Sequence, residues 1–484
     1  MGVNLFNPKV KNRLGTVLLL GIDFFTVFII ITIAGIIRSK AVPALFESPP
    51  PFSISIDFAK YHWIFPLWLI ILAYNGAYSR RFTFWDEVRV LWRSTFFISL
   101  AVFTILFIGK AGADFSRSFI LITCLLSLAV FPVSRTSGKR LLYSMGLLKR
   151  KIIILGTGEI AVKSLSVLRN EANLGYEIAG FIGEGGAGKE KGLIEGIKVH
   201  GFLEKAERYI KRCSIHDVLI AVPEMSRERL APLINRLQQK TENMLFVPDL
   251  AGVAVLGTEL RHFLREQTIM LEMKNNLLRP VNFITKRVFD FLLGLLMFLL
   301  FIVPILVISV LIKATSKGPA IFRQERITRD GRPFKCYKFR TMYLDAEQRL
   351  SGILASDPQA KKEWETYWKL KDDPRVTRIG RFLRETSLDE LPQIFNLLKS
   401  EMSLVGPRPV TREEIERYYK DASKTCFSVL PGITGLWQVS GRNNTGYDYR
   451  IALDLWYIKN WNLWLDFVIL LKTIHVVLKR EGAH

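Results

Sequence analysis

Apolar residues gather in four stretches within the first 140 residues, separated by short polar segments. The stretches cover about residues 16–37, 61–78, 94–109 and 117–134. About 20 apolar residues in a helix are enough to cross the hydrocarbon core of a bilayer; the first stretch meets that length unaided and the third is short. We therefore predict a bundle of four membrane-spanning helices over residues 1–140.

Basic residues around these stretches set the expected orientation. They precede the first stretch, lie between the second and third, and follow the fourth: Lys9, Lys11 and Arg13; Arg80, Arg81, Arg89 and Arg93; Arg135, Lys139, Arg140, Lys149 and Arg150. Because segments rich in lysine and arginine stay in the cytosol, both ends of the bundle are expected there. The first stretch is longer than the apolar core of a signal peptide and lacks a small-residue cleavage site, which favours an anchor over a removed leader.

The next residues alternate between strand-like and helix-like patterns. "KIIILGTG", "YEIAGFIG", "DVLIAVPE" and "NMLFVPDL" are apolar runs rich in β-branched residues, and "EIAVKSLSVLRN" is amphipathic. This alternation predicts a Rossmann-like βαβ domain with a parallel sheet over residues 141–275. Residues 156–161 match the GxGxxA dinucleotide fingerprint. The match predicts either a nucleotide site, with Glu184 on the ribose, or only the tight turn of the fold.

A fifth apolar run covers residues 289–312 and is long enough to cross a bilayer. Basic residues flank both of its ends: Lys286, Arg287, Lys313 and Lys317. Pro304, near its middle, removes a backbone hydrogen bond and can bend the helix. Two structures fit this pattern. One is a re-entrant helical hairpin over about residues 286–313, which enters and leaves the membrane on one side; the other is a kinked full span.

A last apolar stripe repeats at helical spacing near the end of the chain. Its members are Trp461, Trp464, Phe467, Leu471, Ile474 and Leu478, with Asp466 and Lys472 interrupting the run. An aromatic, amphipathic helix of this kind suits the membrane interface. An ordinary core helix fits the same periodicity.

Composition and charge narrow the class of protein. The 484 residues are 49% hydrophobic, and the formal net charge is +23. Beside long apolar runs, this charge favours basic loops that face an anionic membrane surface and anionic substrates over nucleic-acid binding. The four cysteines are far apart and the six histidines are scattered. The sequence therefore predicts neither a disulfide scaffold nor a zinc site.

The acidic pair in "SLDELPQIFN", residues 387–396, allows two interpretations. Ser387 followed by Glu390 has the spacing of a capping box, but Pro392 would then forfeit an interior hydrogen bond. A helix that begins at Asp389 instead places Pro392 in the first turn, where its missing N–H does no harm. Asp389 and Glu390 would then lie at a helix N-terminus, which also favours phosphate.

Arginines around the acidic pair favour chemistry. Arg375, Arg378 and Arg381 are expected on a solvated or headgroup-facing surface. Arg384 is close enough in sequence to share the neighbourhood of the acids, and Arg408 stands in the rigid turn "GPRP". An aspartate can attack phosphorus, a second acid can hold Mg²⁺, and arginines can neutralise phosphate oxygens. The pattern therefore predicts a phosphoryl-transfer site.

Four motifs in chain order then resemble a known family. They are "KRVFD" at 286–290, "FKCYKFRTM" at 334–342, "RETSLDELPQIFNLLKSEMSLVGPRP" at 384–409 and "PGITGLWQVSGRN" at 431–443. Over roughly residues 280–484 the chain resembles the bacterial polyprenyl-phosphate sugar-1-phosphate transferases, the monotopic phosphoglycosyl transferases. The bundle and the βαβ domain look like the long subfamily. The resemblance implies a membrane protein of mixed α and α/β class, with a re-entrant hairpin and a mostly α cytosolic catalytic domain.

The resemblance also implies a reaction and its residues. Asp389 would attack the sugar-bearing phosphorus of a UDP-sugar and release UMP, and undecaprenyl phosphate would then take the sugar phosphate from the enzyme. Glu390 would bind Mg²⁺. The substrate-binding residues would be Lys338, Arg340, Arg384, Arg408, Gln438, Arg442 and Asn443. Galactose is the expected sugar and glucose the alternative.

The same resemblance places the protein in a bacterial inner membrane, in contact with membrane lipids and not with nucleic acid. Because nucleotide sugars are cytosolic, this chemistry favours the re-entrant hairpin over a full crossing. The βαβ domain offers a surface for a homodimer.

Two rival functions remain at this level. A membrane-tethered NAD-dependent nucleotide-sugar dehydratase or epimerase would use the glycine turn, but its YxxxK signature occurs only at Tyr367–Lys371, beyond the fifth apolar run. A membrane scaffold for polysaccharide assembly would leave the acidic pair and its arginines unexplained.

Overall fold

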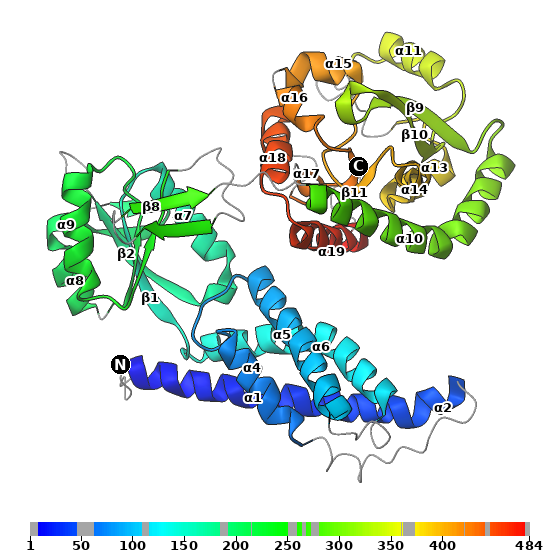
Figure 1. Cartoon of the computed structure of the whole chain (residues 1–484). Coiled ribbons are helices and arrows are strands. Elements are labelled where there is room, and N and C mark those ends of the chain that lie inside the picture. The colour runs from blue at the N-terminus through cyan, green and yellow to red at the C-terminus, as the bar shows by residue number, and fades with distance from the viewer. Residues whose placement is uncertain are drawn as a thin grey trace. The chain divides into compact units, whose positions relative to one another are not determined.

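The computed structural model divides the chain into two compact units, Met1–Asp249 and Leu250–His484 (Figure 1). Each unit is considered by itself. The structure describes residues 8–45, 62–108, 116–183, 192–213, 215–249, 259–263, 268–272, 280–359, 361, 373–420, 422–440 and 446–479.

The first unit begins with a bundle of apolar helices. Its helices are α1 (Pro8–Ile36), η1 (Ile37–Ala41), α2 (Val42–Leu45), α4 (Ile64–Tyr74), α5 (Phe84–Ile108) and α6 (Arg117–Ser144). Helix α6 packs against α1 and α5, and α4 packs against α5, around a core that includes Ile30, Trp68, Ile98 and Phe131. Of these helices, Val10–Ala41, α5 and α6 are long and apolar enough to cross a membrane.

The second predicted span is shorter than expected. Helix α4 has 11 residues, which is about 16 Å at the α-helical rise and about half the hydrocarbon thickness of a bilayer. The chain turns directly after it, where Gly76 adopts a φ of 78° that favours glycine. Among the described residues, the fourth helix of spanning length is instead α10 (Pro280–Thr315) in the second unit.

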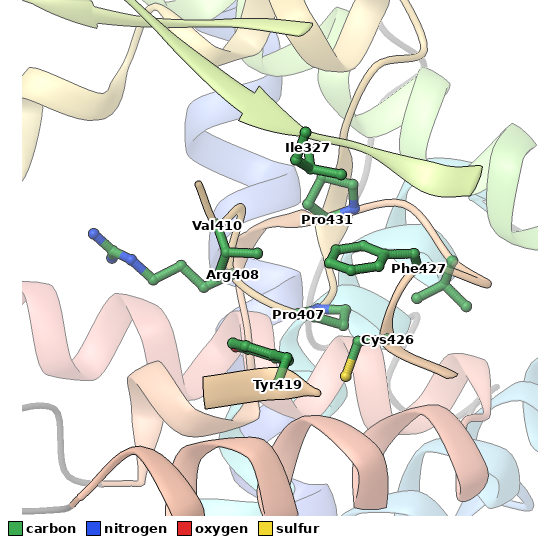
Figure 2. A pocket seen from close by; sticks show the side chains of 9 residues that line it. Ile327, Pro407, Arg408, Val410, Tyr419, Cys426, Phe427 and Pro431 are labelled. Atoms are coloured by element: carbon green, nitrogen blue, oxygen red, sulfur yellow. The ribbon is translucent and has the colours of Figure 1, made fainter. Parts of the chain in front are cut away.

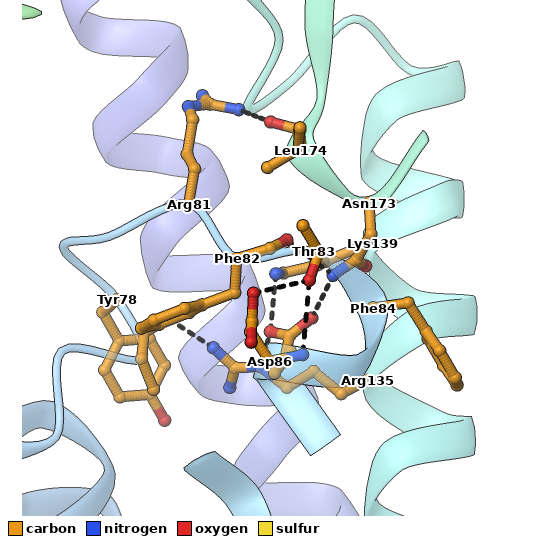
Figure 3. A network of polar contacts seen from close by, with 12 residues as sticks. Tyr78, Arg81, Phe82, Thr83, Phe84, Asp86, Arg135, Lys139, Asn173 and Leu174 are labelled. Carbon is orange, nitrogen blue, oxygen red and sulfur yellow. Dashed lines mark hydrogen bonds and ion pairs between the residues drawn. The ribbon is translucent and has the colours of Figure 1, made fainter. Parts of the chain in front are cut away.

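A buried network of charges joins three helices of the bundle (Figure 3). Arg135 of α6 donates from Nε to Glu87 of α5 at 2.8 Å, from Nη1 to Asp23 of α1, and from Nη2 to the carbonyl of Ala77 at 2.5 Å. Lys139 lies 2.5 Å from the same Glu87 carboxylate. Opposite charges that are buried together with such hydrogen bonds hold the helices in one arrangement.

The same network attaches the bundle to the βαβ domain. Asn173 donates to Glu87 at 2.7 Å. Arg81 donates to the carbonyl of Leu174 and, at 2.7 Å, to the carbonyl of Leu148. Because Asn173 and Leu174 belong to the short helix η2 (Ala172–Leu174), the predicted membrane bundle and the predicted soluble domain form one compact unit.

The βαβ domain has a six-stranded sheet with the order β3-β4-β2-β1-β5-β6. The strands are β1 (Arg150–Leu155), β2 (Tyr176–Gly183), β3 (Leu193–Ile194), β4 (Ile197–Phe202), β5 (Asp217–Ile220) and β6 (Asn243–Phe246), and the helices are α7 (Glu159–Asn170), η3 (Leu203–Lys205), α8 (Ala206–Arg212) and α9 (Arg227–Gln238). All neighbours pair in parallel except β3 and β4. The strand order reverses at β1, as in doubly wound folds. The predicted Rossmann-like architecture is confirmed.

The glycine turn after β1 has a structural explanation. Gly156 has a φ of 111°, and a Cβ there would lie 2.2 Å from the carbonyl oxygen of Ala221, just after β5. Close packing of two strand ends therefore requires glycine at this position without any cofactor. Glu184, the predicted ribose ligand, lies outside the described residues.

The second unit is mostly helical. Its described helices are α10, α11 (Ala346–Ser356), α13 (Arg378–Glu385), α14 (Gln393–Leu398), α15 (Arg412–Glu414), α16 (Ala422–Cys426), α17 (Leu436–Val439), α18 (Tyr447–Lys459) and α19 (Leu463–Lys479), with the shorter turns η5 (Arg329–Gly331), η6 (Leu388–Glu390) and η7 (Ile415–Tyr419). Three two-stranded sheets pair β7 (Glu259–Phe263) with β8 (Thr268–Glu272), β9 (Ile321–Ile327) with β10 (Pro333–Phe339), and β11 (Ser403–Val405) with β12 (Gly432–Thr434).

Helix α10 is one continuous helix that contains Pro304, where the sequence allowed two arms of a hairpin. Figure 1 shows it curving along one side of the second unit. Near its start, Lys286 donates to Asp466 of α19 at 2.7 Å. Near its end, Ile312 packs in a cluster with Phe339 and Leu383. Both ends of α10 therefore contact the same unit.

Candidate functional site

The acidic pair lies in a short turn between two helices. Asp389 and Glu390 form η6 with Leu388, and α14 begins only at Gln393. Ser387 adopts a φ of 55° and makes no side-chain cap hydrogen bond. The capping-box interpretation is therefore wrong, and both carboxylates are displayed by a turn rather than committed to a helix end.

Strand β10 brings a cation to this turn. Lys338 lies with its Nζ 2.7 Å from Oε1 of Glu390. The strand is fixed against α14 because the Asn396 side chain accepts from the Tyr337 amide at 3.0 Å and donates to the Lys335 carbonyl at 2.8 Å. The ion pair is thus held by a buried side chain from the helix that follows the acidic pair.

Asp389 has a perturbed acidity. Burial, and then the neighbouring charge of Glu390, raise the pKa of Asp389 to about 6, although the cations Lys338 and Arg384 act to lower it. Arg384, from α13, donates to the Thr341 hydroxyl at 3.0 Å. A carboxylate that is partly desolvated and faces cations is suited to act as a nucleophile near neutral pH.

Arg408 reaches the same place from a tight turn. A Cβ on Gly406 would lie 2.6 Å from the Leu430 carbonyl oxygen, so the strand end is packed too closely for any other residue. The Arg408 guanidinium lies 5.9 Å from the centre of the Trp437 ring. A small pocket brings together four of the nine predicted residues: Lys338, Glu390, Arg408 and Gln438. Its lining is Arg326, Cys336, Lys338, Glu390, Gln393, Arg408, Pro409, Ile433 and Gln438.

A second pocket lies beside the first and is mainly apolar. Figure 2 shows Pro407, Tyr419, Cys426 and Phe427 around it, while the Arg408 side chain extends away from it. The cationic end of Arg408 is therefore available on the side of the acidic pair.

The remaining predicted residues have different positions. Gln438 is buried and donates to the Ile433 carbonyl at 3.1 Å. Arg340 is buried at the end of α10, where it donates to the carbonyl and the hydroxyl of Ser316 at 2.9 and 2.6 Å. Arg442 and Asn443 lie outside the described residues. The structure therefore brings Lys338, Glu390, Arg408 and Gln438 into one pocket with Asp389 and Arg384 next to it.

A group of residues near Arg408 was not predicted from the sequence as part of the site. Arg326 of β9 lines the pocket and donates to Glu414 at 2.8 Å. Arg450 approaches the same carboxylate to 3.9 Å, and the Trp437 ring lies near both Arg408 and Arg450. Trp437 lies in the motif at residues 431–443, but the sequence does not show that it contacts Arg408. Arg326 and Arg450 stand in separate segments outside the four motifs, so no local pattern marks them.

Comparisons with known proteins identify the family of the chain. Residues 281–480 match the family described as bacterial sugar transferase, and residues 73–248 match the CoA-binding domain family. The chain is 39% identical to the UDP-galactose-lipid carrier transferase of Erwinia amylovora and 37% identical to the undecaprenyl-phosphate galactose phosphotransferase of Salmonella typhimurium, over 84% of each chain in both cases. It is 30% identical to a UDP-glucose:undecaprenyl-phosphate glucose-1-phosphate transferase of Klebsiella pneumoniae over 70% of each chain. With similarity of this extent, the chain belongs to the bacterial sugar transferases.

Proposed function

We propose that the protein transfers galactose-1-phosphate from UDP-galactose to undecaprenyl phosphate, which yields UMP and a lipid-linked diphosphosugar and begins synthesis of a surface polysaccharide. The Erwinia amylovora relative is named for UDP-galactose and a lipid carrier, and the Salmonella typhimurium relative for galactose and undecaprenyl phosphate. The observation that carries the proposal is the Asp389–Glu390 pair, displayed on a turn and faced by Lys338, Arg384 and Arg408.

In the first step, an oxygen of Asp389 attacks the phosphorus that bears the sugar. A bond forms between that oxygen and the phosphorus, and the bond from the phosphorus to the UMP phosphate oxygen breaks, so that UMP leaves with the electron pair. Lys338, Arg384 and Arg408 hold the phosphate oxygens and stabilise the negative charge that develops on them. Arg340, Gln438, Arg442 and Asn443 are proposed as further substrate contacts.

In the second step, a phosphate oxygen of undecaprenyl phosphate attacks the same phosphorus and displaces the carboxylate of Asp389. No proton needs to move, because the phosphoanhydride bond of the lipid diphosphosugar forms as the acyl phosphate bond to Asp389 breaks. Splitting the transfer in this way lets each substrate meet the enzyme in turn.

A divalent ion fits the acidic pair only with help from substrate. The described residues contain no group of three or more histidine, cysteine, aspartate or glutamate side chains that could hold a metal. Mg²⁺ is commonly held by one or two carboxylates together with substrate phosphates, which matches Glu390 beside a bound diphosphate. When bound, the ion withdraws negative charge from the phosphate oxygens.

The membrane geometry proposed here keeps the site in the cytosol. Helix α10 contacts its own unit at both ends, contains Pro304, and has basic residues on both flanks. These features support a re-entrant helix that returns to the cytosolic face of the inner membrane, where UDP-sugars occur and a lipid phosphate lies at headgroup depth. Both soluble domains would then lie in the cytosol, and the βαβ domain is proposed as the dimer surface.

The test is UMP release by detergent-solubilised protein supplied with Mg²⁺, undecaprenyl phosphate and UDP-galactose. We expect release that depends on the lipid and is lost in Asp389→Asn, with a slower reaction on UDP-glucose. Equal release by the two proteins would refute the role of Asp389, and faster turnover of UDP-glucose would replace galactose by glucose.

A further inference from the structure

Arg450 of α18 is a buried cation that keeps two nitrogens without a hydrogen-bond partner among the described residues. The residue is 6% exposed. Within the described part of the chain, neither its Nε nor its Nη2 has a hydrogen-bond partner. The carboxylate of Glu414 approaches Nη1 only to 3.9 Å. A guanidinium removed from water normally has acceptors for its N–H groups, so these two donors need an explanation.

The carboxylate that could have paired with Arg450 is already engaged. Glu414 accepts from Arg326 at 2.8 Å, from the Tyr447 hydroxyl at 3.0 Å and from the Thr411 amide at 2.8 Å. Three other groups therefore fix the position of the Glu414 carboxylate, and Arg450 makes no close hydrogen bond to it.

Aromatic rings hold Arg450 where it is. Its guanidinium carbon lies 5.0 Å from the centre of the Trp437 ring, 5.3 Å from that of Tyr447 and 5.9 Å from that of Tyr419. Contacts of this kind fix a cation without consuming its N–H donors. Arg408, which lines the pocket of the acidic pair, lies 5.9 Å from the same Trp437 ring. Both guanidiniums therefore contact one indole.

Trp437 has a further N–H group without an acceptor among the described residues. Its indole Nε1 is buried and has no hydrogen-bond partner within the described residues. Three nitrogen atoms, Nε and Nη2 of Arg450 and Nε1 of Trp437, therefore have no acceptor among the described residues, beside a residue of the candidate site.

The balance of charge in this group favours an anion. The cations are Arg326, Arg408 and Arg450, and the nearby carboxylates are Glu414 and Asp454. Asp454 is buried under Tyr419, whose hydroxyl lies 3.3 Å away. Burial raises the pKa of Asp454 to about 7 although Arg450 lowers it, so this carboxyl is only partly ionised near neutral pH. Positive charge exceeds negative charge around Trp437.

We propose that Arg450, with the indole N–H of Trp437, forms a second phosphate-binding subsite next to Arg408. It would accept a phosphate oxygen that arrives with substrate and supplies the missing acceptor. The proposal rests on the proposed function, in which both the UDP-sugar and undecaprenyl phosphate carry phosphate. The shared chemistry is a phosphate oxygen, and the experiment decides which substrate provides it.

The experiment compares Arg450→Gln, Arg450→Lys and Trp437→Phe with wild type. Arg450→Lys keeps the charge but loses the fork of donors, and Trp437→Phe keeps an aromatic ring but loses the N–H. The matched control is Arg417→Gln, because Arg417 also lies over a ring, 5.4 Å from the centre of Tyr418, but is exposed. Measurements are the inhibition constants of UMP and of uridine, and the KM for undecaprenyl phosphate.

If the subsite holds the nucleotide phosphate, Arg450→Gln raises the inhibition constant of UMP about 10- to 100-fold, as expected for a lost hydrogen bond to a charged group, and leaves that of uridine unchanged. If it holds the lipid phosphate, the KM for undecaprenyl phosphate rises instead. The other two variants show smaller changes in the same direction, and the control shows none. The proposal is overturned if both constants stay within about twofold of wild type, or if uridine weakens as much as UMP.

Two further readouts keep the result interpretable. Equilibrium binding of UMP to the purified proteins tests the nucleotide arm without turnover, and vesicles containing undecaprenyl phosphate test the lipid arm. A wild type that binds UMP through Arg450 but releases none from either UDP-hexose would contradict the proposed function and leave the subsite standing. If Arg450→Gln does not fold, Arg450→Lys and Trp437→Phe decide the question by the same criteria.

Discussion

Two buried arginines in this protein have opposite surroundings. Arg135, in the helical bundle, uses all three of its nitrogens on Glu87, Asp23 and the Ala77 carbonyl. Arg450, beside the candidate site, leaves two of its nitrogens without an acceptor within the described residues. Burial alone therefore does not separate structural from functional arginines. What separates them is whether the protein itself satisfies the donors, because an unsatisfied buried donor is costly unless a ligand completes it.

The carboxylates differ in the same way. Glu87 accepts hydrogen bonds from Arg135 of the helical bundle and from Asn173 of the βαβ domain, and it forms an ion pair with Lys139 of the bundle. Asp389 sits on a turn beside Glu390, where burial and the second negative charge raise its pKa to about 6. The cations around Glu87 outnumber it and stabilise the fold. Asp389 instead lies beside a second carboxylate, Glu390, and this proximity is expected to keep Asp389 reactive.

The largest expected effect is a loss of stability when the buried charge network of the helical bundle is disrupted. Glu87→Ala leaves Arg135 and Lys139 buried without this acceptor, and we expect a loss of about 3–5 kcal/mol in the free energy of unfolding. Denaturation of the detergent-solubilised protein measures it, with Asp86→Ala as control because Asp86 is exposed. A change as small as in the control would show that the network does not stabilise the first unit.

A change in the site should instead lower activity and spare stability. Lys338→Met removes the ion pair with Glu390 and the proposed phosphate contact, and we expect UMP release to slow by about 10²–10³-fold, as for loss of one charge-stabilising donor. The control is Lys335→Met, on the same strand but exposed. Equal activity of the two variants would argue against a role for Lys338, and a drop in unfolding temperature would make that role structural.

The pH dependence tests the crowding of the acidic pair. Asp389 attacks only as the carboxylate, so kcat/KM should fall about tenfold per pH unit below about pH 6. In Arg384→Gln a cation that lowers the pKa of Asp389 is lost, and the acidic limb should move to higher pH. A limb that stays in place or moves to lower pH would contradict the electrostatic account of this site.

The smallest expected effect concerns backbone strain next to the acids. Ser387 has a φ of 55°, a left-handed conformation that costs a non-glycine residue about 1–2 kcal/mol. We expect Ser387→Gly to leave stability unchanged or to raise it by up to about 1 kcal/mol, because relief of strain is partly offset by the entropy of glycine. Thermal unfolding measures it, and a clear destabilisation would mean that the Ser387 side chain supports the turn.

Sequence patterns predicted what is local and failed where burial decides. The apolar stretches gave α1, α5 and α6, and strand alternation gave the Rossmann-like sheet, because these elements follow from periodicity. Helix α4 is shorter than predicted because the chain turns at Gly76, within the predicted apolar stretch. Helix α10 continues through Pro304, so the proline does not separate two arms of a hairpin there, and the pattern of apolar residues left both structures open.

The site shows the same division. Asp389, Glu390 and Arg408 stand in motifs and could be singled out from the sequence, although their mutual placement depends on Asn396 and the packing around Gly406. Arg450 could not be recognised as a site residue from the sequence, because the lack of acceptors for its Nε and Nη2 among the described residues results from tertiary contacts between separate segments. Arg340 was expected to bind substrate, and its contact with Ser316 at the end of α10 became visible only in the structure.

The central claim is that Asp389 carries the sugar phosphate between the two substrates. The most direct measurement incubates the protein with UDP-galactose labelled in its sugar-bearing phosphate, without lipid, and maps the label by proteolysis and mass spectrometry. We predict label on the peptide that contains Asp389 and its transfer to undecaprenyl phosphate when the lipid is added. Formation of labelled lipid at full rate in Asp389→Asn, with no label on the protein, would contradict the account.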